Sequence, residues 1–243
     1  MNFNHILATL VALTGLVGSA AQATTVNLVA NGDFETTTNG VGQINAHTVA
    51  TGWTSTGYNF LFAPNTADTT GTYGGLTLWG PGKGAANGLV NSPTGGNFLA
   101  ADGAYGVAPI SQIITGLVAG KTYDLGFYWA AAQQSGYTGL NTEQWIVSLG
   151  GQTISTSVYN NASHGFSGWM HESFTYTATS TSEVLSFLAR GTPTGEPPFS
   201  LLDGVSLTAN VPEPSTTALI VGGLVLLGCA SRLRRRRAAA SAQ

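Results

Sequence analysis

Hydrophobic and polar residues alternate in short runs through most of the chain, and the runs end at Gly, Asn, Asp, Pro or Ser. Apolar residues that recur at every second position share one face of a β-strand. Five runs show such a face most clearly. Their alternating apolar residues are Tyr123, Leu125, Phe127 and Trp129; Trp145, Val147 and Leu149; Phe174 and Tyr176; Leu185 and Phe187; and Val205 and Leu207. Further short runs that also predict strands lie at 26–34, 74–80, 97–103 and 107–117.

Between 24 and 210 no helical periodicity of useful length occurs, so the pattern predicts an all-β domain. About nine or ten short strands with frequent turn residues indicate a jelly-roll β-sandwich. Gly150 and Gly151 suit a tight hairpin between two of these strands. The stretch 36–96 is less regular and rich in Gly, Thr and Asn, which predicts long loops, where binding sites are often found.

The first 23 residues have the pattern of a secretory signal peptide. An apolar run at 6–17 is followed by Ala21, Gln22 and Ala23, which match the small-x-small cleavage pattern. The segment before the run carries no Lys or Arg, which departs from the usual pattern, and a buried N-terminal helix is the alternative. We expect cleavage after Ala23 and export of the chain from Thr24 onward.

A second uncharged apolar segment lies near the other end, at 218–230. With its flanking residues it reaches about 16 residues and about 24 Å as a helix, short of the ~30 Å hydrocarbon core. An arginine cluster comes directly after it, which the positive-inside rule places in the cytoplasm. We therefore expect one C-terminal transmembrane helix and a cytoplasmic tail at 238–243; a soluble core helix with a basic tail is the alternative. The stop-transfer cluster consists of Arg232, Arg234, Arg235, Arg236 and Arg237.

Removing both ends changes the charge of the molecule. The part from 24 to 210 holds three basic and ten acidic residues, a net charge of −7, against −3 for the whole chain. An acidic domain argues against nucleic acid as a partner and is compatible with cations and neutral glycans. The only cysteine, Cys229, lies in the apolar segment, so the expected exported domain has no disulfide.

The C-terminal 211–237 resembles the PEP-CTERM sorting signal of Gram-negative bacteria, because a Pro212-Glu213-Pro214 motif, an apolar segment and the arginine cluster occur in order. The resemblance implies recognition and cutting by the membrane enzyme exosortase. It implies an inner-membrane anchor before processing and a place at the cell surface or outside the cell afterwards. The two prolines disfavour regular helix and hold the backbone extended, which suits a protease-like cleft.

The domain at 24–210 resembles galactose-binding-like jelly rolls, the form of many carbohydrate-binding modules. The resemblance rests on NLVANGDFE at 27–35, LLDGVSLT at 201–208 and the stretch 95–130. It implies a structural Ca²⁺ shared by Glu35 and Asp203, and calcium accepts such oxygen ligands. Gly204 stands where relatives often have a second Asp, which removes one ligand. The alternatives are turn chemistry for Asp203 and a solvated strand end for Glu35.

Carbohydrate-binding modules use exposed aromatic faces, and the loop-rich half offers Trp53, Tyr58, Tyr73 and Trp79 as a stacking platform. The alternative is that most of these side chains belong to the core. Trp129 and Trp145 lie on alternating strands and are expected in the core.

Little in the sequence indicates catalysis. Glu143 and Glu172 are of the type that a glycoside hydrolase needs, but their spacing does not single them out. His164 and His171 match no zinc signature. We therefore expect a non-enzymatic surface or extracellular-matrix protein that binds polysaccharide in exopolysaccharide or biofilm. A secreted glycan-active hydrolase and a purely structural adhesin are the alternatives.

Overall fold

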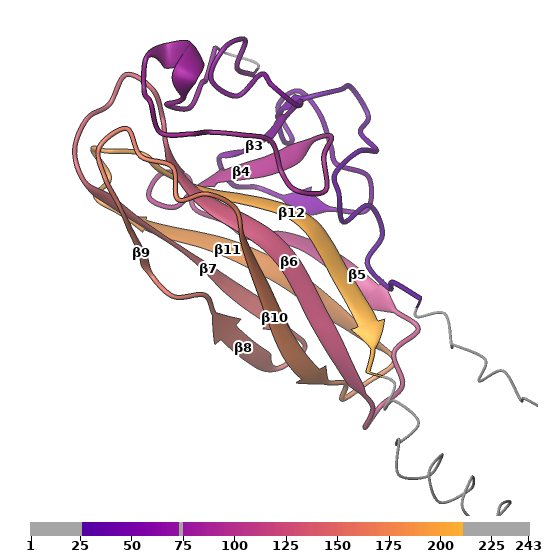
Figure 1. The fold of residues 1–243 in the computed structure, drawn as a ribbon. Helices are drawn as coiled ribbons and strands as arrows, with labels where there is room; N and C mark the ends of the chain where they lie inside the picture. Colours follow the sequence, from indigo (N-terminus) through magenta and orange to yellow (C-terminus); the bar gives the residue numbers. More distant parts are fainter. Residues whose placement is uncertain (1–25, 73–74, 211–243) are drawn as a thin grey trace, which may run out of the picture.

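The computed structural model describes residues 26–72 and 75–210, which form two packed antiparallel sheets (Figure 1). The predicted signal peptide, the PEP-CTERM motif, the apolar segment, the arginine cluster and the tail at 238–243 lie outside the described residues. Within 26–72 and 75–210, no helix is long and apolar enough to cross a membrane.

One sheet, called the β6 sheet below, has six strands in the order β1–β3–β4–β12–β6–β10. Its strands are β1 (Gly42–Gln43), β3 (Asn59–Phe62), β4 (Phe98–Asp102), β6 (Thr122–Gln133), β10 (Met170–Thr177) and β12 (Pro198–Ala209).

The other sheet, called the β7 sheet, has the order β2–β5–β11–β7–β8, and β9 also pairs with β7. Its strands are β2 (Thr54–Ser55), β5 (Ile110–Thr115), β7 (Asn141–Leu149), β8 (Gln152–Ser155), β9 (Tyr159–Asn161) and β11 (Ser182–Thr192). A short 3₁₀ helix, η1, covers Pro81–Lys83.

The chain crosses repeatedly between the sheets, from β4 to β5, β6 and β7 and again from β9 to β10, β11 and β12. Such crossing is the connectivity expected of a jelly roll. The long strands carry the predicted alternation, since β7 buries every second side chain along its whole length. The prediction of an all-β, two-sheet sandwich is confirmed.

Two of the expected strands are only partly formed. In 26–34 the ladder contact is a bridge between Asn27 and Thr208, and in 75–80, the described part of 74–80, it is a bridge between Leu78 and Gln134. Asn31 and Phe34 have positive φ angles of 50° and 56°, which interrupts an extended strand. The Asn-Gly-Asp turn at 31–33 therefore overrides the apolar alternation around it.

The main core fills the space between the two sheets. Phe187 from β11 packs its ring against Trp53, Phe127 and Trp145, with centroids 6.2, 5.1 and 6.0 Å away. Trp129 and Trp145 are 1% and 0% exposed, which confirms their predicted place in the core. In sheets this long, such burial supplies most of the favourable free energy of folding.

A second core lies on the outer face of the β6 sheet. Phe60, Phe98 and Phe199 are buried there beneath loop residues that include Leu76 and Leu78. In Figure 1 the loop chain around η1 lies above β3 and β4. Because loops cover the outer face, β3 and β4 are buried along their entire lengths.

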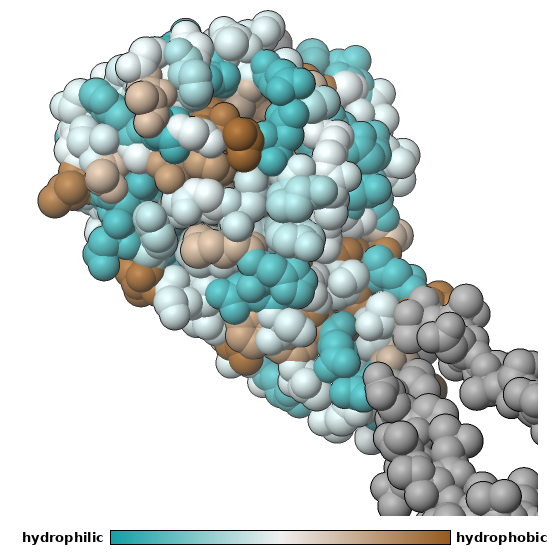
Figure 2. All heavy atoms as spheres, viewed as in Figure 1, coloured by the Kyte–Doolittle hydropathy of each residue, from teal (hydrophilic) through white to brown (hydrophobic). Residues whose placement is uncertain are grey.

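The two ends of the sandwich differ in what they contain. The described chain begins and ends side by side, where Asn27 bridges Thr208; we call this the terminal end. The opposite end, the loop end, carries the β6–β7 and β11–β12 connections and the long loops of 63–97 (Figure 1). On the face shown in Figure 2, hydrophobic residues stand singly or in small groups among polar ones.

Candidate functional site

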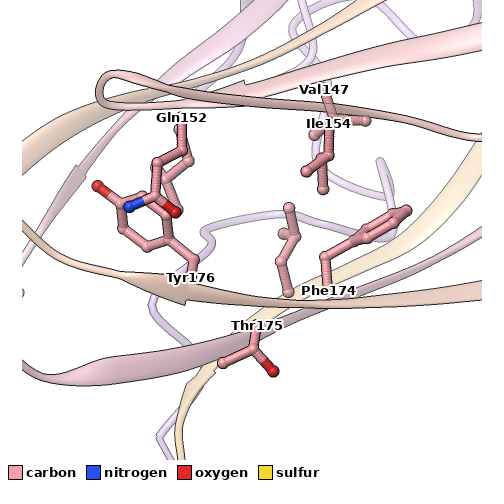
Figure 3. Close-up of a pocket in the computed structure, with 8 residues that line it drawn as sticks. Val147, Gln152, Ile154, Phe174, Thr175 and Tyr176 are labelled. Carbon is pink, nitrogen blue, oxygen red and sulfur yellow. The ribbon is translucent and has the colours of Figure 1, made fainter.

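A narrow apolar slot opens between the edge strands β8 and β10, where Ile154 and Phe174 approach each other (Figure 3). Its volume is about 20 Å³. A space of this size holds about one water molecule and no sugar ring. The slot is therefore too small to serve as a binding site for a glycan.

Trp53 does not form part of a binding surface. Its side chain is 1% exposed, its ring packs 5.4 Å from that of Phe34, and its Nε1 donates a hydrogen bond of 2.9 Å to the Asn31 carbonyl. The prediction that Trp53 stacks on a sugar is therefore wrong, because its indole completes the main core. Tyr73, also predicted for the platform, lies outside the described residues.

Tyr58 and Trp79 both lie at the loop end and are half-buried. The Tyr58 ring meets Tyr105 edge-to-face with centroids 5.2 Å apart. Trp79 lies on the His164 ring with centroids 3.9 Å apart and donates from Nε1 to the Tyr137 carbonyl at 2.7 Å. The structure thus keeps two of the four predicted aromatic residues at the surface.

Sequence reasoning missed two exposed tyrosines beside them. Tyr105 is 61% exposed and Tyr137 is 42% exposed, both in loops at this end. Burial raises the pKa of Tyr58 above its usual value, and Asp102, Tyr105 and Tyr137 raise this pKa further. Asp102, Tyr105 and Tyr137 therefore lie within electrostatic range of the Tyr58 hydroxyl.

We call the patch formed by Tyr58, Trp79, Tyr105, Tyr137 and His164 the aromatic surface. In the sequence, Tyr105 and Tyr137 are marked only by nearby glycines in a loop, a pattern too common to identify a binding residue.

Two side-chain amides hold loops of the aromatic surface. The fully buried Gln133 accepts the His164 N–H at 2.7 Å and donates to the Gly139 carbonyl at 3.1 Å. Asn87 donates to the carbonyls of Trp79 and His164 at 2.9 and 2.8 Å. Three loops that are distant in sequence are therefore joined, which pre-organises the rings above them.

Asp102 shapes the loop that carries Tyr105. Its Oδ1 accepts the N–H groups of Ala104 and Tyr105 at 2.8 and 3.0 Å. Burial raises the pKa of Asp102, while these two hydrogen bonds lower it. The carboxyl therefore acts as the acceptor that turns the chain after β4.

Asp203, proposed for calcium, is completely buried in β12. One carboxyl oxygen accepts a hydrogen bond from Thr94, and the other has no partner among the described residues. Burial raises its pKa to about 6, hydrogen bonds from Ser92, Thr94 and Gly204 lower it, and nearby Asp33 raises it. A buried carboxyl with one free oxygen fits a role as a ligand to a hard cation.

Glu35 contacts the segment 92–97, which also contains Thr94, the hydrogen-bond partner of Asp203. Its Oε1 accepts the Asn97 N–H at 2.6 Å, and the carboxyl leaves no room for a side chain on Gly96. The segment 92–97 therefore contacts both Glu35 and Asp203. Of the two carboxyl groups, that of Asp203 is buried and that of Glu35 is exposed. Within 26–72 and 75–210, no group of three or more His, Cys, Asp or Glu side chains could hold a metal.

The structure also explains the glycine at position 204. It has φ of +58° beside a register shift of β12 against β6. A Cβ atom there would lie 2.7 Å from Thr94 Cγ2 and 3.1 Å from the Tyr128 ring. A second Asp at this position is therefore incompatible with the observed backbone.

The carboxylates considered for hydrolysis do not share a cleft. Glu143 is completely buried at the start of β7, whereas Glu172 lies in edge strand β10, opposite Phe127 in the middle of β6. His164 stacks on Trp79 and His171 on Tyr128. These four side chains therefore do not meet in one site.

No family model matches the chain. Among curated proteins it is similar to halomucin of Haloquadratum walsbyi, with 28% identity over 220 residues. This match covers 89% of the chain, which spans 2% of the length of that relative.

Solved structures similar to this chain include three β-rich modules. TmCBM61 in complex with β-1,4-galactotriose has 17% identity and a TM-score of 0.39, covering 76% of this chain and 99% of that one. The CBM22-1 xylan-binding domain of Paenibacillus barcinonensis Xyn10C has 12% identity and a TM-score of 0.38, and the match covers 78% of this chain and 97% of that one. The K1 adhesin domain of Lys-gingipain from Porphyromonas gingivalis has 12% identity and a TM-score of 0.42, and the match covers 78% of this chain and 100% of that one. With TM-scores below 0.5, these likenesses carry no argument about what this chain binds.

Proposed function

We propose that the sandwich is a carbohydrate-binding domain that holds a neutral glycan on the aromatic surface. The observation that carries the proposal is the pair of exposed tyrosines, Tyr105 and Tyr137, beside the half-buried Trp79. Flat aromatic rings offer an apolar face to the C–H groups of a sugar, and their polar ends stay available to its hydroxyls. The side-chain amides of Gln133 and Asn87 hold three loops together, so little conformational entropy is lost on binding.

The position of the surface suits a protein that is attached through its C-terminus. Asn27 and Thr208 mark the terminal end, and the β6–β7 connection, which carries Tyr137, lies at the opposite end (Figure 1). An anchor after residue 210 therefore leaves the tyrosines facing away from the membrane. In our proposal the chain is exported, is sorted by an exosortase at Pro212–Pro214, and binds polysaccharide in the extracellular matrix of a biofilm.

A calcium ion forms part of the proposal. Glu35 and Asp203 supply carboxylate oxygens, and the carbonyls of 92–97 complete the set. When bound, the ion supplies positive charge that keeps Asp203 ionised inside the protein. Its role is to fix the 92–97 loop against β12, so that the second core is closed.

A glycan array on residues 24–210 tests the binding proposal. We expect binding to a neutral glycan that falls about 2- to 13-fold in each of Tyr105→Ala and Tyr137→Ala, as one lost stacking contact implies. Tyr128→Ala is the matched control, because Tyr128 lies on the outer face of β6 and stacks on His171. The absence of binding to every neutral glycan would contradict the proposal and favour a structural adhesin.

Thermal melting tests the calcium proposal separately. We expect a chelator to lower the midpoint of the wild type and to leave Asp203→Asn unchanged. Asp68→Asn is the control, because the Asp68 carboxylate accepts a hydrogen bond from the Gly82 N–H and is not one of the proposed calcium ligands. An unchanged midpoint in the wild type would rule out a structural ion.

A further inference from the structure

A polar groove crosses the outer face of the β7 sheet at the loop end. Two adjoining depressions form it, of about 260 and 320 Å³, and both are lined by Thr142 and Thr192. Thr192, Thr142 and Asn160 stand in one row across β11, β7 and β9. We call this feature the β7 groove; it is separate from the aromatic surface and from Asp203.

Arg190 lines one half of the groove and is exposed. Its guanidinium group makes no hydrogen bond or ion pair with any residue of 26–72 or 75–210. It is also one of only three basic residues between 24 and 210, beside ten acidic ones. A guanidinium group that is left free in such an acidic chain offers two parallel donors to a carboxylate.

The other half of the groove offers amides. Asn141 is 2% exposed, donates from Nδ2 to the Glu196 carbonyl at 3.4 Å, and has a buried Oδ1 without a partner among the described residues. An unpartnered acceptor inside a protein is costly unless a ligand or water donates to it. Asn160 is exposed and lines the same hollow, so ligand hydroxyls can reach its amide group there.

The floor of the groove adds no negative charge near neutral pH. Glu143 lies beneath, completely buried, and burial raises its pKa to about 9. Gln144, which stands opposite Arg190, is held by its own hydrogen bond of 2.7 Å to the Thr156 carbonyl. Val158 is 54% exposed on one side of the groove and adds an apolar contact.

We propose that the β7 groove binds an acidic glycan segment, with a uronate carboxylate on Arg190 and sugar hydroxyls on the threonine and asparagine side chains. Hydroxyl and amide groups alternate with small apolar contacts along the groove, which suits the edges and C–H faces of sugar rings. Arg190 has no charged partner among the described residues, so its guanidinium group can pair with one carboxylate of the segment. With two glycan sites, one chain would link a neutral and an acidic polysaccharide.

Isothermal titration of the 24–210 chain with trigalacturonate tests this site. We expect binding that weakens at least about tenfold in Arg190→Gln, in keeping with the loss of a charge-assisted pair. The fully methyl-esterified trisaccharide should bind at least about tenfold more weakly than the acid. Lys83→Gln is the matched control, because it removes an equal charge in η1, and it should bind as the wild type does.

Three outcomes would overturn the proposal: equal affinity in Arg190→Gln, equal affinity for the methyl ester, or equal binding of triglutamate, which would assign the groove to acidic peptides. The Tyr105→Ala variant separates this site from the aromatic surface. It should keep trigalacturonate affinity whether or not the neutral glycan binds. Because Arg190 is exposed, the variant is expected to fold, and its melting midpoint verifies this.

Discussion

The terminal end and the loop end of the sandwich are built by different rules. Toward the terminal end, β6 and β7 alternate between apolar residues in the main core and exposed or half-exposed ones outside. At the loop end a third layer covers the β6 sheet, and polar side chains enter the interior. The buried polar residues at that end include Asp102, Gln133, Asn141, Glu143, Asn161 and Ser200.

The difference shows where the molecule gains and loses free energy. Apolar burial between the sheets is favourable wherever it occurs. Buried polar groups are tolerated only with partners, yet Asn141 Oδ1, Glu143 Oε2 and Ser200 Oγ have none among the described residues. Toward the terminal end the same holds for Tyr176 Oη and Glu183 Oε2. Both ends thus give up some stability, and at the loop end the polar groups concerned lie beside the residues that line its surfaces.

The largest effect is expected in the main core. Phe187→Ala should lower the free energy of unfolding by about 3–5 kcal/mol, because it leaves a cavity among three aromatic neighbours. Urea unfolding measures the change. A loss below about 1 kcal/mol would contradict the view that the two-sheet core carries the stability.

The next effect should have the opposite sign. The pKa of Glu143 rises from 4.5 to about 9 through burial, so the folded state holds a proton that the unfolded state releases. Stability from this group is complete below about pH 4.5 and is lost as the pH rises toward 9. Glu143→Gln should therefore stabilise the protein by about 3 kcal/mol at pH 7 and very little at pH 4.5.

Urea unfolding at several pH values measures this difference. Glu172→Gln, in edge strand β10, is the control and should show no comparable dependence on pH. A difference between wild type and Glu143→Gln that stays constant with pH would contradict the buried, protonated state of Glu143.

A smaller effect is expected at Gly139. Its φ is +131°, and a Cβ atom would lie 2.9 Å from the Glu196 carboxyl carbon. Gly139→Ala should cost about 1–3 kcal/mol and weaken glycan binding by displacing the Tyr137 loop. Gly136→Ala is the matched control, because its φ is also positive while nothing lies within 4 Å. Equal costs in both would show that the contact with Glu196 is unimportant.

The smallest change in stability is expected for Tyr105→Ala, which should nevertheless weaken glycan binding at the aromatic surface. Tyr105 is 61% exposed, so Tyr105→Ala should alter the free energy of unfolding by less than about 0.5 kcal/mol. Glycan affinity should nevertheless fall by the factor proposed for the aromatic surface. A large loss of stability would place Tyr105 in the structural framework and weaken the contrast between the two ends.

Local pattern predicts the strands well where each has one buried face. The alternation around Trp129, Trp145 and Phe187 is confirmed, because a period of two results directly from strand geometry. The pattern predicts less well at 74–80, where Leu78 belongs to a loop that covers a sheet. An apolar residue that packs against a sheet from outside has the same signature in sequence as one within it.

The aromatic residues show the same limit. Trp53 and Trp79 both lie in a stretch rich in Gly and Thr, and nothing local separates them. One turns into the main core and donates to Asn31, while the other lies on His164, 85 residues further along the chain. Which aromatic residue faces solvent depends on partners that the neighbouring sequence does not contain.

The strand periodicity, the all-β class and the acidic charge of the domain could all be predicted from the chain alone, because each depends on residue type and local spacing. The packed sandwich adds which tyrosines are exposed. It also adds that, among the described residues, one Asp203 oxygen has no hydrogen-bond partner and Arg190, beside Thr142 and Thr192, has no charged partner. These properties depend on contacts between segments that are far apart in the chain, and such contacts form only when the two sheets pack.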